Sequence, residues 1–137
     1  MHPDHEEIAT GFVTAITTGD TEALRRLYAP DARIWHNGDG TEQTVEDNLR
    51  TLRWLARNLH DFRYEEIRRD PAAYGYVQRH VLRGRLPDGT AVEVPACLFV
   101  TVDGGRITRI EEYADSRATD ALRAHAAARR AAREAQR

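Results

Sequence analysis

The feature that most constrains the fold is a change in hydrophobic period near residue 60. Before this point apolar residues recur at helical spacing, most clearly at Val45, Leu49 and Leu52. After it come four segments of strand character, the last three separated by tight turns. A chain whose helices come first and whose antiparallel strands follow has the order of elements typical of an α+β fold. Because such strands are long and twisted, we expect a curved, conical sheet, antiparallel or mixed, wrapped around about three N-terminal helices and leaving a cavity.

The expected elements can be stated as residue ranges. Helices are predicted over 6–17 and 44–59, and a short helix begins at Asp20 or Thr21 and stops at Pro30. Thr44 and Asp47 approximate a capping box at the start of the third helix. A short strand is expected over 32–36, and four longer strands over 62–69, 74–86, 90–102 and 106–113. Residues 1–120 form one predicted domain, and the Ala- and Arg-rich residues 121–137 form a helix or tail.

Composition excludes several classes of protein. A chain of 137 residues with a net charge of -2 has room for one core and no overall field that favours nucleic acid or a membrane surface. Its N-terminal residues are polar and acidic, unlike a signal peptide, and no apolar stretch is long enough to span a bilayer. We therefore expect a cytoplasmic protein that binds neither nucleic acid nor membrane. Cys97 is the single cysteine, which excludes an internal disulfide and a CxxC motif.

Three stretches carry a resemblance to a known superfamily: Leu-Tyr-Ala-Pro-Asp-Ala-Arg-Ile-Trp-His-Asn at 27–37, Val-Gln-Arg-His-Val-Leu-Arg at 77–83, and Gly-Gly-Arg-Ile-Thr-Arg-Ile-Glu-Glu-Tyr-Ala-Asp at 104–115. In this order they resemble the nuclear-transport-factor-2-like superfamily, which includes SnoaL-like polyketide cyclases, ketosteroid isomerases, scytalone-type dehydratases and limonene-epoxide-hydrolase-like enzymes. The resemblance covers about residues 5–120. It implies a pocket for a small hydrophobic oxygenated molecule, and the scaffold hosts both enzymes and non-catalytic proteins.

His80 and Asp115 are the candidate catalytic residues. The arginines at 79 and 83 require their face of the strand to be turned outward, so Gln78 and His80 are expected to face the pocket. The resemblance implies a histidine on this strand in the dehydratases and cyclases. An Asp–His pair is suited to moving a proton next to a carbonyl group. A structural histidine, and an Asp115 that caps the C-terminal helix, are the alternatives.

Further side chains are candidates for substrate binding. Asn37 can donate to a substrate oxygen, or can be a turn residue before Gly38, and the aromatic candidates can be plain core. In a regular strand only one of Trp35 and His36 can face inward. The predicted substrate-binding set is Tyr28, Trp35, Asn37, Trp54, Gln78 and Tyr113.

The leading functional hypothesis is a cofactor-free isomerase, cyclase or dehydratase that uses His80 and Asp115 for acid–base catalysis. The first alternative is an epoxide hydrolase, whose Asp-Arg-Asp triad and Tyr-x-Asn pair would correspond to Asp115, Trp35 and Asn37. That triad is altered here, because Gln78-Arg79-His80 stands in place of Arg-x-Asp. The second alternative is a non-catalytic binding or assembly module. No cofactor and no metal site are expected, since His2 and His5 alone are weak evidence for a metal site.

The expected partner is a second copy of the chain. Val77 and Val81 lie among arginines on the outward strand face, which gives a mixed surface suited to association. The resemblance points the same way, because members of the superfamily often pair through their sheets. We therefore predict a homodimer.

Overall fold

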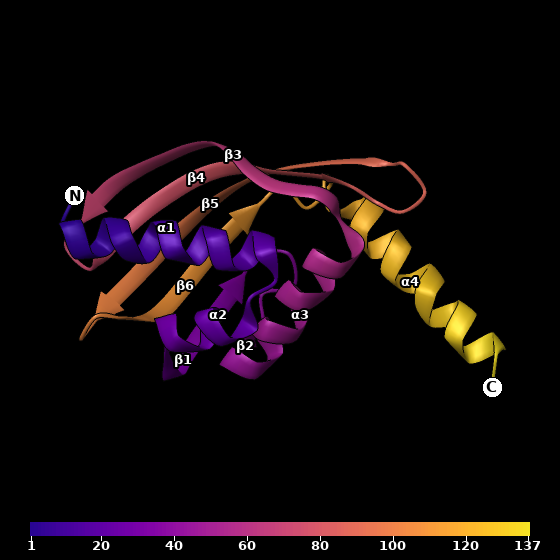
Figure 1. Ribbon diagram of the computed structural model, residues 1–137, viewed down its shortest axis with the longest axis horizontal. Helices are drawn as coiled ribbons and strands as arrows, with labels where there is room; N and C mark the ends of the chain where they lie inside the picture. Colours follow the sequence, from indigo (N-terminus) through magenta and orange to yellow (C-terminus); the bar gives the residue numbers. More distant parts are fainter.

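A six-stranded mixed sheet forms one layer of the fold and three helices cover its inner face (Figure 1). The computed structural model describes all 137 residues. The sheet has the order β2-β1-β6-β5-β4-β3, is not closed, and is antiparallel except where β1 and β6 run parallel. The elements in chain order are α1 (Pro3–Thr18), α2 (Thr21–Leu27), β1 (Tyr28–His36), β2 (Glu42–Gln43), α3 (Val45–Asn58), β3 (His60–Ala72), β4 (Gly75–Arg85), β5 (Ala91–Asp103), β6 (Arg106–Ala114) and α4 (Asp120–Ala135).

Local sequence signals account for the helix ends. Gly19 ends α1 in the left-handed conformation, with φ 71°, and Asp20 caps α2 by accepting from the backbone N–H of Ala23. Thr44 and Asp47 complete the predicted capping box of α3, in which each side chain accepts from the other residue's backbone N–H. The predicted α+β fold with three N-terminal helices and a curved mixed sheet is therefore confirmed.

Several boundaries differ from the sequence prediction: α1 begins at Pro3, β3 extends over His60–Ala72, and the short strand β2 was not expected. The second helix ends at Leu27 rather than at Pro30, and β1 begins four residues earlier than expected, at Tyr28. Tyr28 is extended, with φ -85° and ψ 141°, because β1 pairs in parallel with β6 from Tyr28 onward. This pairing joins segments far apart in the chain and leaves no local signal.

The curvature of β3 has an identifiable cause. Asp61 and Glu66 have positive φ angles of 54° and 55°, and the pairing of β3 with β4 shifts register at both places. Such bulges bend a strand and increase its twist. The sheet consequently curls over the helices, as Figure 1 shows for β3 above α1.

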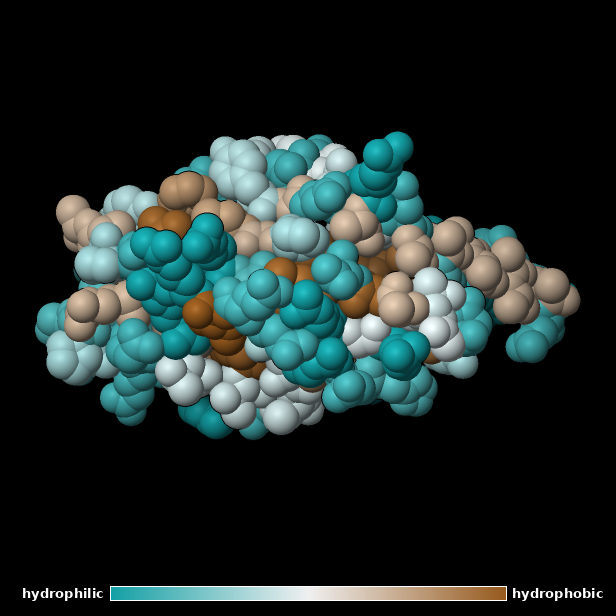
Figure 2. Space-filling model, turned by 90° about the horizontal axis from the view of Figure 1, so that it is seen from above, coloured by the Kyte–Doolittle hydropathy of each residue, from teal (hydrophilic) through white to brown (hydrophobic).

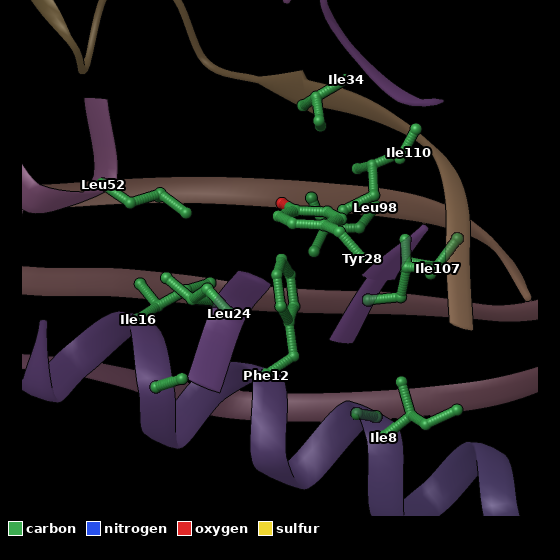
Figure 3. Close-up of a cluster of buried hydrophobic side chains, with 14 of the residues drawn as sticks. Ile8, Phe12, Ile16, Leu24, Tyr28, Ile34, Leu52, Leu98, Ile107 and Ile110 are labelled. Atoms are coloured by element: carbon green, nitrogen blue, oxygen red, sulfur yellow. The ribbon is translucent and has the colours of Figure 1, made fainter. Parts of the chain in front are cut away.

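The main core fills the space between the helices and the inner face of the sheet. Tyr28 lies among Phe12, Leu98 and Ile110 in this core (Figure 3), and its ring meets that of Phe12 edge-on at 5.8 Å between centroids. A smaller cluster under the other end of the sheet includes Leu82 and Val94, with Leu122 of α4 packed against it. These two clusters leave an unfilled space between them, described below.

The C-terminal segment forms one helix that projects from the body. Figure 1 shows α4 leaving the end of the sheet, and Figure 2 shows it as an arm of mixed, mildly apolar and hydrophilic surface, with hydrophobic surface visible where the arm meets the body. No residue of α4 is fully buried. None of the helices combines the length and the apolar character needed to cross a membrane.

Candidate active site

A cavity of about 310 Å³ lies between the helices and the inner face of the sheet. Its wall is mostly apolar, as expected for a site that takes a small hydrophobic molecule. Thirteen of its eighteen lining residues are hydrophobic: Phe12, Ile16, Tyr28, Ile34, Leu52, Trp54, Leu55, Tyr64, Leu82, Leu98, Ile110, Leu122 and Ala126. The remaining five are His36, Asn48, Thr51, Glu112 and Arg123.

His36 and Glu112 form the titratable pair of this cavity. Parallel pairing of β1 with β6 sets the two residues side by side, and His36 Nε2 lies 3.5 Å from Glu112 Oε1. Burial raises the pKa of the Glu112 carboxyl above its usual range, and His36 opposes that shift in part. A carboxyl group with a raised pKa in an apolar cavity can accept and return protons near physiological pH.

Two tyrosines complete the polar part of the wall. The Tyr28 hydroxyl donates to Asn48 Oδ1 at 2.6 Å, and Asn48 Nδ2 donates to Gln43 Oε1 at 3.1 Å, so Tyr28 is held by a network. Burial and the nearby charge of Glu112 raise the pKa of Tyr64, which keeps its hydroxyl protonated. Tyr64 lines the cavity and donates to no other side chain, so its O–H group is free to donate to a ligand oxygen.

His80 faces inward as predicted, but it lies behind the cavity wall and not in it. It is 3% exposed, and its ring stacks on that of Tyr64 at 4.0 Å between centroids and 11° between planes. Arg69 Nε donates to Gln78 Oε1 at 2.9 Å, which leaves the Gln78 amide N–H₂ to donate to His80 Nδ1 at 3.0 Å. Burial and the charge of Arg69 lower the pKa of His80 to about 4. His80 is thus neutral at neutral pH and supports Tyr64.

Asp115 lies outside the cavity, so the expected His80–Asp115 pair does not form there. Asp115 is exposed, and its Oδ1 accepts from the backbone N–H groups of Arg117 and Ala118, at 3.0 and 3.4 Å, in the turn before α4. Both residues border an open hollow on the outer face of the sheet, but the His80 ring is turned to the inner face, where it stacks on Tyr64. The alternative role, Asp115 as the cap of the C-terminal helix, is not met either: the N-cap of α4 is Thr119, and Asp115 instead closes the turn that precedes it.

Five of the six predicted substrate-binding residues lie in three places. Tyr28 and Trp54 line the cavity, and Gln78 is buried beside it in the hydrogen-bond network of His80. Trp35 and Tyr113 do not line it: their rings meet at 5.2 Å on the outer face of the sheet, because in β1 it is His36 that faces inward.

Asn37 is also outside the apolar cavity. Its side chain accepts from the backbone N–H of Ala114 at 3.0 Å and donates to the Ala114 carbonyl at 3.2 Å, which ties the end of β1 to the end of β6. With Asn37 and Asp115 occupied by backbone contacts, the water-holding arrangement expected for an epoxide hydrolase is not assembled.

Sequence reasoning missed Glu112, Tyr64 and the inward orientation of His36. Strand parity carried a usable signal: His36 is two residues after the buried Ile34, and Glu112 is two residues after the buried Ile110. A polar residue that continues an apolar strand face is a candidate for a pocket wall. No group of three or more His, Cys, Asp or Glu side chains is placed to hold a metal ion.

Comparison with known proteins agrees with this architecture. The model of the SnoaL-like domain matches residues 9–110. None of the curated proteins compared with the sequence matches it.

Solved structures of similar shape come from several bacteria. One, assigned as a SnoaL-like polyketide cyclase from Shewanella denitrificans OS-217, is 17% identical, covers 90% of this chain and 99% of its own, and has a TM-score of 0.72. The polyketide cyclase candidate IdmH from Streptomyces antibioticus is 24% identical over 81% of this chain and 91% of its own, with a TM-score of 0.71. A protein with a ketosteroid isomerase-like fold from Catenulispora acidiphila DSM 44928, in complex with trimethylamine, is 21% identical over 78% of this chain and 84% of its own, with a TM-score of 0.68. The family match over residues 9–110 shows that the chain belongs to the SnoaL-like domain family, and these solved structures share its fold.

Proposed function

We propose that this protein is an enzyme that moves a proton next to the carbonyl group of a small hydrophobic oxygenated molecule. One observation carries the proposal: the carboxyl group of Glu112 lies in the wall of a mostly apolar cavity, with a raised pKa and with His36 at 3.5 Å. The Glu112 side chain is 25% exposed, and holding a carboxyl group partly out of water has a cost; such groups cluster at functional sites. The reaction type is that expected from the sequence, with different residues in the catalytic roles.

Each group of the cavity has a role in this reaction. The Glu112 carboxylate removes a proton from the carbon next to the carbonyl, and the electrons of that C–H bond move to the carbonyl oxygen to form an enolate. Tyr64 donates its hydroxyl hydrogen bond to that oxygen, where negative charge develops. His36 beside Glu112 favours its charged form and so keeps the base available.

The fate of the enolate defines the reaction class. Return of the proton from Glu112 to another carbon is an isomerisation, attack of the enolate carbon on a second carbonyl is a cyclisation, and loss of a hydroxyl group is a dehydration. Among similar structures are proteins described as polyketide cyclases and as having a ketosteroid isomerase-like fold, which supports this range of chemistry.

The proposal can be tested before the natural substrate is known. 2-Tetralone is a small apolar ketone whose hydrogens next to the carbonyl exchange with D₂O, and NMR follows that exchange. We expect the wild-type protein to accelerate exchange, and Glu112→Gln to reduce the acceleration by about 10²-fold or more, because the base is lost. Glu111→Gln, one residue away on the opposite face of the same strand, is the matched control and should exchange as wild type does.

Two further results would decide between competing sites and functions. Asp115→Asn should leave exchange unchanged, since its carboxylate caps a turn outside the cavity; a loss equal to that of Glu112→Gln would return the catalytic role to Asp115. If the wild-type protein binds 2-tetralone but never accelerates exchange, the proposed chemistry is wrong and a binding module is the better description.

A further inference from the structure

The apolar cavity opens into a second, polar hollow. This outer hollow, of about 450 Å³, is bordered by only two hydrophobic residues among twelve. His36, Thr51, Glu112, Leu122 and Arg123 line both spaces, so the two adjoin at the His36–Glu112 pair. A molecule that fills the cavity therefore has one end among apolar side chains and the other in a polar mouth.

Arg123, in the first turn of α4, supplies a cation at this junction. Its only ion-pair partner is Asp120, at 3.6 Å, and both side chains are more than half exposed, so the pair is weak. The guanidinium of Arg123 therefore retains donors for a ligand in the mouth.

Gly38 makes room for this guanidinium. A Cβ atom at residue 38 would lie 3.0 Å from Arg123 Nη2, closer than ordinary contact. Gly38 does not have a positive φ, so its backbone conformation alone does not require glycine. Its missing side chain instead allows Arg123 to lie over the turn after β1, facing the mouth.

We infer that Arg123 is a specificity-determining residue, and that the ligand of this protein is an apolar molecule with a carboxylate at one end. The apolar body occupies the cavity, and the carboxylate lies in the mouth against the Arg123 guanidinium, whose planar donors match it. The inference deepens the proposed function, on which it rests for placing the reacting carbon beside Glu112.

The other charges at the mouth are compatible with an acidic ligand. Asp39 borders the outer hollow, and its Oδ1 accepts from the backbone N–H of Thr41 at 3.0 Å, a donor that offsets part of its negative charge. Glu112 also borders the outer hollow, and His36 Nε2, 3.5 Å from Glu112 Oε1, offsets part of its negative charge. Arg123 and His36 are the two basic groups that face the same space.

Equilibrium binding tests the inference without any turnover. Calorimetry would compare 2-naphthoic acid with 2-naphthalenemethanol, which has the same ring system and no charge. We expect Arg123→Gln to weaken binding of the acid about tenfold and to change binding of the alcohol by less than about twofold. Arg130→Gln, an exposed arginine farther along α4, should bind both compounds as wild type does.

Two outcomes would overturn the inference: unchanged binding of the acid by Arg123→Gln, or no binding of the acid to the wild-type protein at millimolar concentration. The proposed acid–base function is judged separately, because binding of the acid should persist in Glu112→Gln. If the wild-type protein does not accelerate proton exchange but still prefers the acid to the alcohol, the proposed catalysis is wrong and the binding role of Arg123 is supported.

Discussion

Replacing His80 with glutamine should change how stability depends on pH. In the folded protein burial and the charge of Arg69 lower the pKa of His80 from 6.5 to about 4. Between these values the unfolded chain binds a proton at His80 and the folded chain does not, so stability is lost as pH falls from 6.5 to 4. At about 1.4 kcal/mol per pH unit, the full loss is about 3 kcal/mol. Glutamine at this position cannot titrate.

The measurement is urea unfolding, followed by circular dichroism, of both proteins between pH 7.5 and 4.5. Glu112 acts in the opposite direction over part of this range, because its raised pKa makes the folded state hold the extra proton. Both proteins contain Glu112, so its effect cancels when their unfolding free energies are subtracted. The unfolding free energy of His80→Gln, minus that of wild type, should increase by more than about 2 kcal/mol from pH 7 to pH 4.5. A difference that stays constant with pH would show that His80 is not held neutral by its surroundings.

Three further predictions follow from single features. Tyr28→Phe should cost about 1–3 kcal/mol in urea unfolding, because Asn48 loses the donor that lies 2.6 Å from its Oδ1; no loss would mean that water replaces this bond. A chain that ends at Leu122 should keep its circular dichroism spectrum and a melting temperature within about 5 °C of wild type, because α4 buries no residue completely; a larger loss would make α4 part of the core. We propose that two copies pair through the outer sheet face, where Tyr113 is 49% exposed. Sedimentation should then show a dimer at micromolar concentration, and Tyr113→Glu should shift the protein towards monomer. A monomeric wild type would refute the pairing.

Much of the fold could be predicted because its signals are local. The stripe through Val45, Leu49 and Leu52, with Thr44 and Asp47 before it, predicted α3 to within a residue or two. Gly19 predicted the end of α1 in the same way. Helical and strand periods record which side of an element is buried, and the residues of one element suffice to show them.

The candidate site was harder to predict because its members come from separate elements. The alternation of side chains along β4 correctly predicted that Gln78 and His80 face inward. It could not show that Tyr64 of β3 lies between His80 and the cavity. Asp115 lies two residues after Tyr113, so the two side chains are expected on the same side of the strand, and both lie on the outer face of the sheet. Which side of a strand is buried is a local property, whereas which buried residues reach a cavity depends on their neighbours.

Local patterns in the chain were enough to predict the α+β class, the order of the helices and long strands, and the family suggested by the stretches at 27–37, 77–83 and 104–115. The contact between His36 and Glu112 could not be predicted in this way, since they lie 76 positions apart and the parallel pairing of β1 with β6 joins them. The physical reason is that helix and turn preferences act between near neighbours, whereas strand partners are selected by the packing of the whole chain. A cavity is the space that this packing leaves, so its lining cannot be read from any one segment.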